Sequence, residues 1–312
     1  MMVPAALLLL GALTAVLAPR VLARAEFPDR EPVVALWVWQ CVVVAVLLCC
    51  ALSMTLSAAA AWQAVRGHVF APAPSTVVEA YAFGVPGPWA AVTAVALACA
   101  GAWSGVTLVR EIARARARRC RQEAELLDRA PLLPGEESGP DGRLVVLESE
   151  RPDAWWLPGS VPRLVVTTAA LRRLKGRQLD AVLAHEQGHA RARHDWLLHS
   201  SAALATAFPQ VPVFAAFRDE MHRLVELAAD DMASRRHGRL TTALALVELN
   251  EDRGVFGPGP STQAHVPQRV TRLLTPPRRL TPARRLRLTA AGALVPVIPV
   301  LVTFGPGLRA LG

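Results

Sequence analysis

Three uninterrupted apolar runs in the first 110 residues restrict what this chain can fold into. They cover about residues 2–19, 33–58 and 85–109, close to or above the roughly 20 residues that a helix needs to cross a bilayer. A fourth run, about 288–305, is shorter and contains two prolines. Hydrophobic residues make up 53% of the chain, more than soluble proteins usually carry. The sequence therefore predicts an α-helical multi-pass membrane protein with four spans, three before and one after a central segment.

The arginines that flank the runs predict the orientation. No positive charge precedes the first run and its arginines follow it, so we interpret it as a retained anchor and not as a signal peptide. Cytoplasmic flanks of spans are enriched in arginine. Arginine clusters follow the third run and precede the fourth, so we expect the central segment in the cytoplasm and the amino terminus outside the cell membrane. These clusters are Arg110, Arg114, Arg116, Arg118, Arg119 and Arg121, and Arg272, Arg278, Arg279, Arg284, Arg285 and Arg287.

The net charge of +9 raises the question of nucleic acid. Because the arginines cluster beside apolar runs, we expect a lipid bilayer and no direct nucleic acid as the partner. The predicted division is residues 1–110 for three transmembrane helices, 111–142 for a basic juxtamembrane segment and linker, 143–287 for a cytoplasmic domain, 288–305 for the fourth span and 306–312 for a short tail.

The central domain combines strand and helix patterns. Short segments rich in β-branched and aromatic residues, "RLVVLES", "DAWWLPG" and "RLVVTTAAL", predict three strands, the second of them at an edge. Two helical patterns follow, at about 176–207 and 215–236. The domain is therefore expected to be α+β.

The segment "HEQGH" contains the pattern HExxH. On a helix, His185 and His189 lie one turn apart on one side, where a zinc ion can bridge them. Glu186 lies beside this face and is placed to take a proton from a water that the metal activates. A polar patch on a surface helix is the alternative explanation for the same pattern.

The second helical pattern offers what the first one lacks. A catalytic zinc site needs a third protein ligand and keeps one position open. Glu226 is a candidate ligand, and Asp230, one turn later, is placed to bind the second nitrogen of a ligand imidazole. Asp231 points about 100° away and fits less well. We therefore expect one Zn²⁺ per chain, bound by His185, His189 and Glu226.

Other polar residues compete for roles near this site. On one continuous helix His194 would face away from His185, and His199 would lie more than three turns beyond it, so both are expected to be structural or solvated. The only tyrosine, Tyr81, lies in a loop predicted outside the membrane. His222 is one turn before Glu226 and is a candidate for stabilising the oxyanion, with a plain helix-surface role as the alternative. Further candidates for that role are Arg223, Arg235, Arg236 and His237.

Trp155 and Trp156 lie in the predicted edge strand. Such a strand can bind a peptide by adding it to the sheet. Packing of the two aromatic rings at the bilayer interface is the alternative. The apolar stretch 196–217, interrupted by Pro209 and Pro212, either dips into the membrane interface or belongs to the core of the domain.

Together these motifs resemble a known group of proteins. HEQGH followed by ELAAD is similar to the gluzincin pattern HExxH plus ExxxD, which occurs in membrane peptidases of the HtpX and CAAX prenyl protease type and in the BlaR/MecR antirepressor peptidases. "PRLVVTTAAL", "RHDWL" and "VPQRVTRLL" extend the resemblance over about residues 143–275. The predicted arrangement of three spans, a cytoplasmic zinc domain and one span is similar to BlaR/MecR.

The resemblance implies a zinc metalloendopeptidase in signal transduction that cleaves a cytoplasmic winged-helix repressor. BlaR and MecR carry a penicillin-sensing domain after the last span, whereas "GPGLRALG" follows it here, so direct β-lactam sensing is not expected. An HtpX-like quality-control or processing protease is the alternative, and a receptor that keeps the zinc fold without catalysis is a further one.

Overall fold

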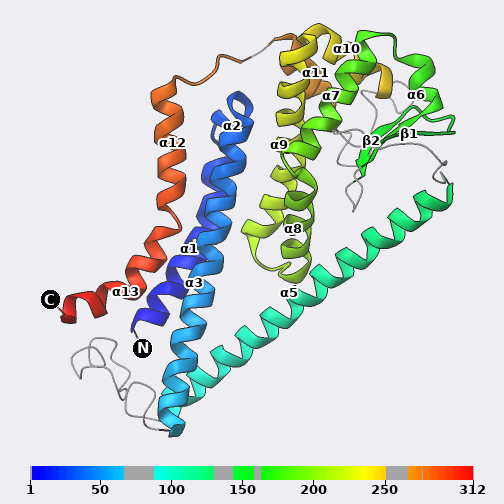
Figure 1. Ribbon diagram of the computed structural model, residues 1–312. Helices are drawn as coiled ribbons and strands as arrows, with labels where there is room; N and C mark the ends of the chain where they lie inside the picture. Colours follow the sequence, from blue (N-terminus) through cyan, green and yellow to red (C-terminus); the bar gives the residue numbers. More distant parts are fainter. Residues whose placement is uncertain are drawn as a thin grey trace.

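The computed structural model describes residues 2–66, 88–129, 143–157, 163–250, 266–275 and 277–311. Figure 1 shows long helices beside one another, with a smaller group of helices and strands near one end of them. The predicted linker 130–142, most of the predicted loop 61–84 and Tyr81 lie outside the described residues. The described part of the chain is mostly helical.

The first two apolar runs form α1 (Met2–Ala23) and α3 (Pro32–Arg66), which pack along each other. A short helix, α2 (Phe27–Arg30), connects them. The segments Val3–Ala23 and Pro32–Ala59 are long and apolar enough to cross a membrane. The prediction of two spans here is therefore supported by length and hydropathy.

The fourth run is divided between two helices. α12 (Pro282–Leu294) and α13 (Val297–Leu311) are bent by 48° at the break between them. Pro296 lies in this break, and its missing N–H and its ring interrupt a helical hydrogen-bond ladder. The pair counts as a third candidate span only if the bent unit crosses the membrane as one.

The third run lies in α5 (Pro88–Arg129), a single helix of 42 residues. At 1.5 Å per residue it is about 63 Å long, which exceeds the thickness of a bilayer. The basic segment that follows the third run thus continues the same helix. α5 is not among the candidate spans found in the described residues, so the four-span arrangement stays a prediction.

The three predicted strands form one small sheet. β1 (Arg143–Leu147) pairs in parallel with β3 (Arg163–Thr167), and β2 (Ala154–Leu157) pairs antiparallel with the other side of β3. The order β1-β3-β2 leaves β2 at an edge, as the sequence predicted. All five residues of β3 are buried, which fits a central strand.

Helices complete the domain around this sheet. The side chain of Thr167 caps α6 by accepting a hydrogen bond from the Ala170 N–H. α9 (Pro212–His237) begins with Pro212 in its first turn and is followed by Gly238, whose φ of 87° suits glycine. The helices are α6 (Thr168–Arg173), α7 (Arg177–Arg191), α8 (His194–Ala207), α9 (Pro212–His237), α10 (Arg239–Asn250) and α11 (Val266–Leu274).

The prediction of one helix over 176–207 is wrong. The chain breaks between α7 and α8 at Arg193, which has a left-handed backbone with φ 51° and ψ 43°. A single residue in this conformation ends the helical hydrogen-bond ladder and redirects the chain. The consequence falls on His194, whose side chain no longer follows the periodicity of α7.

Two hydrophobic cores hold the fold together. The smaller one lies between the sheet, α7 and α10 and includes Val166 and Ala170, which are fully buried. The larger one joins the candidate spans to the hairpin formed by α8 and α9. It includes Trp39 of α3 and Phe217 of α9, whose ring centroids are 6.3 Å apart. The stretch 196–217 therefore packs against the long helices and not against the sheet.

Polar contacts fix the loop between α1 and α3 to the domain. Asp29 of α2 forms an ion pair with Arg223 of α9. Arg272 of α11 donates to the backbone carbonyl of Asp29 at 2.8 Å and to the carboxylate of Asp231 at 2.8 Å. α9 and α11 are thus both bound to the segment that connects α1 and α3.

Candidate metal centre

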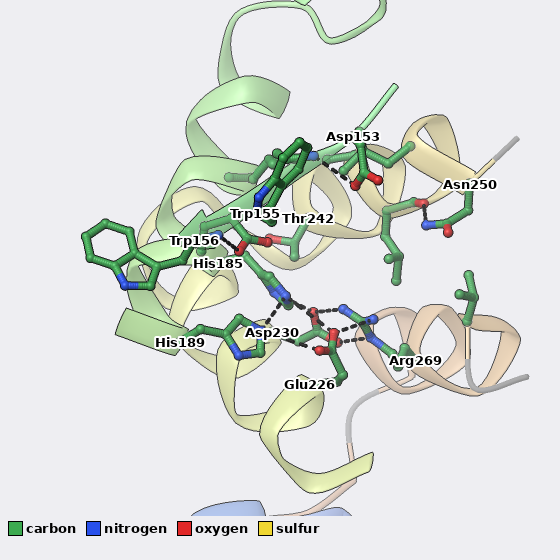
Figure 2. A pocket seen from close by; sticks show the side chains of 18 of the residues that line it. Asp153, Trp155, Trp156, His185, His189, Glu226, Asp230, Thr242, Asn250 and Arg269 are labelled. Atoms are coloured by element: carbon green, nitrogen blue, oxygen red, sulfur yellow. Dashed lines mark hydrogen bonds and ion pairs between the residues drawn. The ribbon is translucent and has the colours of Figure 1, made fainter. Parts of the chain in front are cut away.

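The predicted ligands come from two helices that pack against each other. α7 carries His185, Glu186 and His189, and α9 carries Glu226 and Asp230. The four-residue spacing on each helix turns His185 and His189 toward Glu226 and Asp230, as Figure 2 shows. The structure thus brings these five residues together, whereas His222, the further candidate on α9, is not among the residues that line the cavity.

Three donor atoms converge in the manner of a metal site. The Nε2 atoms of His185 and His189 are 3.1 Å apart. Each of them lies 3.5 Å from a carboxylate oxygen of Glu226. One potential ligand atom from each of the three residues lies within 4.8 Å of the others. Two imidazole nitrogens and one carboxylate oxygen are a donor set that suits zinc.

The outward nitrogens of both imidazoles are held by other side chains. The Nδ1 atom of His185 lies 3.1 Å from Asp230 Oδ1, as the sequence predicted for this aspartate. The Nδ1 atom of His189 lies 3.1 Å from Nδ1 of His194. A proton on Nδ1 of each ring leaves its Nε2 lone pair directed at the shared site. Asp230 and His194 therefore orient the two rings.

The charges around the rings differ. Burial lowers the pKa of His185, but hydrogen bonds and charges from Asp230 and Glu226 outweigh it and raise the pKa to about 10. Burial lowers the pKa of His189 to about 3, against the opposing charge of Glu226. Burial likewise lowers the pKa of His194 to about 4. His189 and His194 are thus neutral at pH 7. A metal bound at Nε2 of His185 would displace the proton from that nitrogen.

An arginine from α11 completes the charge balance. Arg269 donates from Nε and Nη2 to the two carboxylate oxygens of Asp230 at 2.8 and 2.7 Å. Its Nη1 lies 2.7 Å from Glu226 Oε2. Burial raises the pKa of Glu226, but Arg269 and the histidines lower it well below its usual value. One buried guanidinium therefore fixes both the candidate ligand Glu226 and the aspartate behind His185, as seen in Figure 2.

Glu186 is held by the edge strand. The backbone N–H of Trp156 in β2 donates to Glu186 Oε2 at 3.1 Å. Burial raises the pKa of Glu186 to about 7, and the positive charge of His185 and the Trp156 N–H oppose this rise. A carboxylate poised near neutral pH, beside a metal site, suits a residue that takes up and releases a proton.

The site opens into a cavity of about 400 Å³. His185, Glu186, His189 and Glu226 line it on one side, and Trp155 and Trp156 line it from β2. The other walls come from the hairpin and from α10 and α11. They include Asp195, Leu198, Thr242, Leu246, Asn250 and Val266. A volume of this size accommodates several residues of an extended peptide beside the edge strand.

The candidates for the oxyanion role lie elsewhere. His222 is exposed on α9 and is not among the residues that line the cavity, so its catalytic role stays a prediction. Arg223 is paired with Asp29 and Glu220. Arg235 donates to the backbone carbonyl of Asp231, and Arg236 donates to Gln187 at 3.4 Å. His237 is the last residue of α9 and is likewise absent from the described lining.

Two residues of the site were missed by sequence reasoning. His194 was placed on the far side of a continuous helix, and only the break at Arg193 brings it behind His189. Arg269 lies 39 residues after Asp230 and on a different helix, with α10 between them in the sequence. The one signal in the sequence was that Arg269 lies in "VPQRVTRLL", a segment that is part of the resemblance to the gluzincin peptidases.

Substitution of His194 should weaken metal binding without removing a ligand. In H194F the Nδ1–H of His189 loses its acceptor, and we expect zinc affinity to fall about 10- to 100-fold. Competition with a chelating dye measures this change in the full-length protein. The matched control is H199F, since His199 lies five residues further along α8 and, among the described residues, is bound to the backbone carbonyl of Asp195. Equal affinities of the two variants would show that His194 does not orient the ligand.

Comparison with known proteins adds one match. Residues 134–219 match the model of peptidase family M48. The matched segment contains the three strands, α7 and α8, and ends before Glu226. No curated protein and no solved structure matches the chain significantly. The match covers less than a third of the chain and supports an M48-type metallopeptidase. It does not single out the BlaR/MecR group that the topology favoured.

Proposed function

We propose that the protein is an integral-membrane zinc metalloendopeptidase. The observation that carries this proposal is the convergence of His185, His189 and Glu226 within 4.8 Å, directly beside Glu186. Its support outside the site is the M48 match and the two apolar helices at the amino terminus. A surface polar patch does not account for donors that are partly buried and whose outward nitrogens are bound to Asp230 and His194.

Each residue has a defined part in peptide hydrolysis. Zinc held by His185, His189 and Glu226 would lower the pKa of a water and polarise the scissile carbonyl. Glu186 takes one proton from the attacking water and delivers it to the nitrogen of the breaking C–N bond. Asp230 and His194 keep the imidazoles oriented, and Arg269 holds Glu226 in place. The edge strand β2 binds the substrate backbone in extended form.

For the substrate, we propose a cytoplasmic protein, with a winged-helix transcriptional repressor as the leading candidate. This rests on the arginine clusters that predict a cytoplasmic domain and on the resemblance to BlaR/MecR. The contacts of Asp29 with Arg223 and Arg272 support a signalling role, because they connect the segment between α1 and α3 to α9 and α11, which carry Glu226 and Arg269. An HtpX-like quality-control protease is also compatible with the M48 match.

Peptidase activity is tested on the purified full-length protein. We expect cleavage of an unfolded probe protein, β-casein, to stop after treatment with 1,10-phenanthroline and to return on addition of zinc, because three protein ligands hold an exchangeable ion. Cleavage that survives complete removal of zinc would contradict a zinc mechanism.

The substrate is identified by comparing new protein amino termini in cells with and without the gene. A single DNA-binding protein whose cleavage product disappears, together with restored repression of its target genes, supports the repressor proposal. Accumulation of many uncleaved membrane proteins would instead favour the quality-control role. If neither class of protein is cleaved although zinc is bound, the result would favour the non-catalytic receptor.

A further inference from the structure

The hairpin formed by α8 and the first turns of α9 lies beside helices that are apolar enough to cross a membrane. Its core residues Leu197, Leu204, Phe214 and Phe217 join one buried cluster with Trp39 and Val43 of α3. α9 also packs against α1, and α8 packs against α5. Figure 1 shows the free end of the hairpin beside the middle of α3. The hairpin therefore shares its depth with the candidate spans.

The depth follows from helix geometry. Trp39 is seven residues into α3, about 10 Å along the helix from Pro32. Phe217 packs against Trp39, and Pro212 lies five residues, or about 7.5 Å, further in the same direction. The turn of the hairpin thus lies roughly 18 Å from the start of α3. This is close to the midpoint of Pro32–Ala59, which is about 20 Å from the same end.

The composition of the hairpin matches this depth. Between Asp195 and Arg218 the sequence carries no acidic residue, lysine or arginine. The exposed positions in this interval are Trp196, Thr206, Pro209, Gln210 and Pro212, all of them uncharged. Charged residues return at Arg218 and Asp219, about 8 Å from the start of α3 by the same geometry and within about 3 Å of the edge of a roughly 30 Å hydrocarbon layer centred on Pro32–Ala59. A hairpin surrounded by water would normally carry charged residues among its exposed positions.

The turn also limits the number of backbone groups that need water. Phe208 and Val211 donate their N–H groups to the carbonyls of Leu204 and Phe208 at 3.0 and 3.1 Å. Pro209 and Pro212 have no N–H. Four of the five positions from 208 to 212 therefore have no backbone N–H that needs a hydrogen bond to water. Unsatisfied backbone groups are the main obstacle to placing a turn in hydrocarbon, and this turn has few.

We infer that residues 196–217 form a hairpin inserted into the cytoplasmic leaflet of the membrane, with its exposed residues in contact with lipid acyl chains. The inference rests on α1 and α3 crossing a bilayer and is independent of peptidase activity. Insertion places the uncharged hairpin between α3, which packs against α9, and α5, which packs against α8.

The test is photocrosslinking of the full-length protein in phosphatidylcholine nanodiscs. p-Benzoyl-phenylalanine replaces Gln210 at the turn, and in a second variant Thr206, so that the result does not depend on one substitution. Matched positions are Val44, exposed on α3 at similar depth, and Arg235, exposed about 27 Å beyond Phe217 on α9. Mass spectrometry of the irradiated protein detects a mass increase of one phospholipid.

We expect lipid adducts at positions 210 and 206 in yields close to that at position 44 and about tenfold above that at position 235, because only the first three sites face acyl chains. Yields at 210 and 206 as low as at 235 would overturn the inference in favour of an aqueous hairpin. Crosslinked dimers in place of lipid adducts would overturn it in favour of contact with a second copy.

Discussion

Glu186→Gln is expected to abolish peptide hydrolysis while the protein keeps its zinc. Glutamine has the same shape and can still accept the Trp156 N–H, but it cannot take a proton from water. The loss of a general base typically costs about 10²- to 10⁴-fold in rate. The rate of β-casein cleavage and the zinc content of the purified variant measure the two properties side by side.

The control for this experiment is Gln187→Glu, the neighbouring residue on α7, whose side chain contacts Arg236 away from the site. It should cleave at the wild-type rate. If Glu186→Gln retains more than about a tenth of the activity, another group acts as the base, since a correctly placed base supplies more than that. If the variant loses its zinc as well, the result reports on the metal site and not on the base.

Arg269→Met is expected to destabilise the metal-free protein by about 3–5 kcal/mol, the usual effect of removing one partner from a buried ion pair. Asp230 is only 1% exposed and would be left without its guanidinium partner. For a domain of this size the apparent Tm should fall on the order of 10 °C. Thermal unfolding in detergent with a chelator present measures the effect, because bound zinc would otherwise balance part of the charge.

Arg272→Met is the matched control, one turn further along α11. Arg272 pairs with Asp231, whose side chain is 20% exposed whereas that of Asp230 is 2% exposed, so the loss of Arg272 should destabilise the protein less than the loss of Arg269. Adding Asp230→Asn to Arg269→Met should recover part of the stability, because the uncompensated charge is then removed. Equal unfolding temperatures for the two arginine variants would contradict the role assigned to Arg269.

The same pair predicts how stability depends on pH in the metal-free protein. Burial raises the pKa of Asp230, but the charge and hydrogen bonds of Arg269 and the contact with His185 outweigh this and lower it to about 2 from an ordinary 3.8. The stabilisation is therefore complete above about pH 4 and is lost as the pH falls toward 2. In Arg269→Met this acid-dependent loss should be smaller, which unfolding scans across that range would detect.

Local patterns were sufficient to predict which side chains meet at the candidate site. The four-residue spacings in HEQGH and ELAAD fix which side chains share a helix face, and the structure brings His185, His189, Glu226 and Asp230 together. The edge position of β2 also followed from its sequence and its neighbours. These features depend on contacts within one turn of helix or on the order of a few strands, which sequence periodicity encodes.

The remaining features depend on events that periodicity does not encode. One left-handed residue, Arg193, separates two helices whose combined pattern suggested one, and this reassigns His194 from the far face to the site. Arg269 reaches Asp230 from α11, a helix that lies 39 residues further along the chain. The packing of the hairpin against α3 depends on contacts far apart in the sequence, such as that between Trp39 and Phe217.

The hydrogen bond from Trp156 to Glu186 has a consequence for how a substrate is selected. The backbone amide that holds the proposed base belongs to the edge strand on which a peptide would lie. The position of each substrate residue along that strand and the position of the base are therefore set by the same few peptide units. A peptide shifted by one residue would present its alternate face, and the bond opposite Glu186 would change with it. Under the proposed function, β2 would therefore relate which substrate side chains are recognised to which peptide bond is broken.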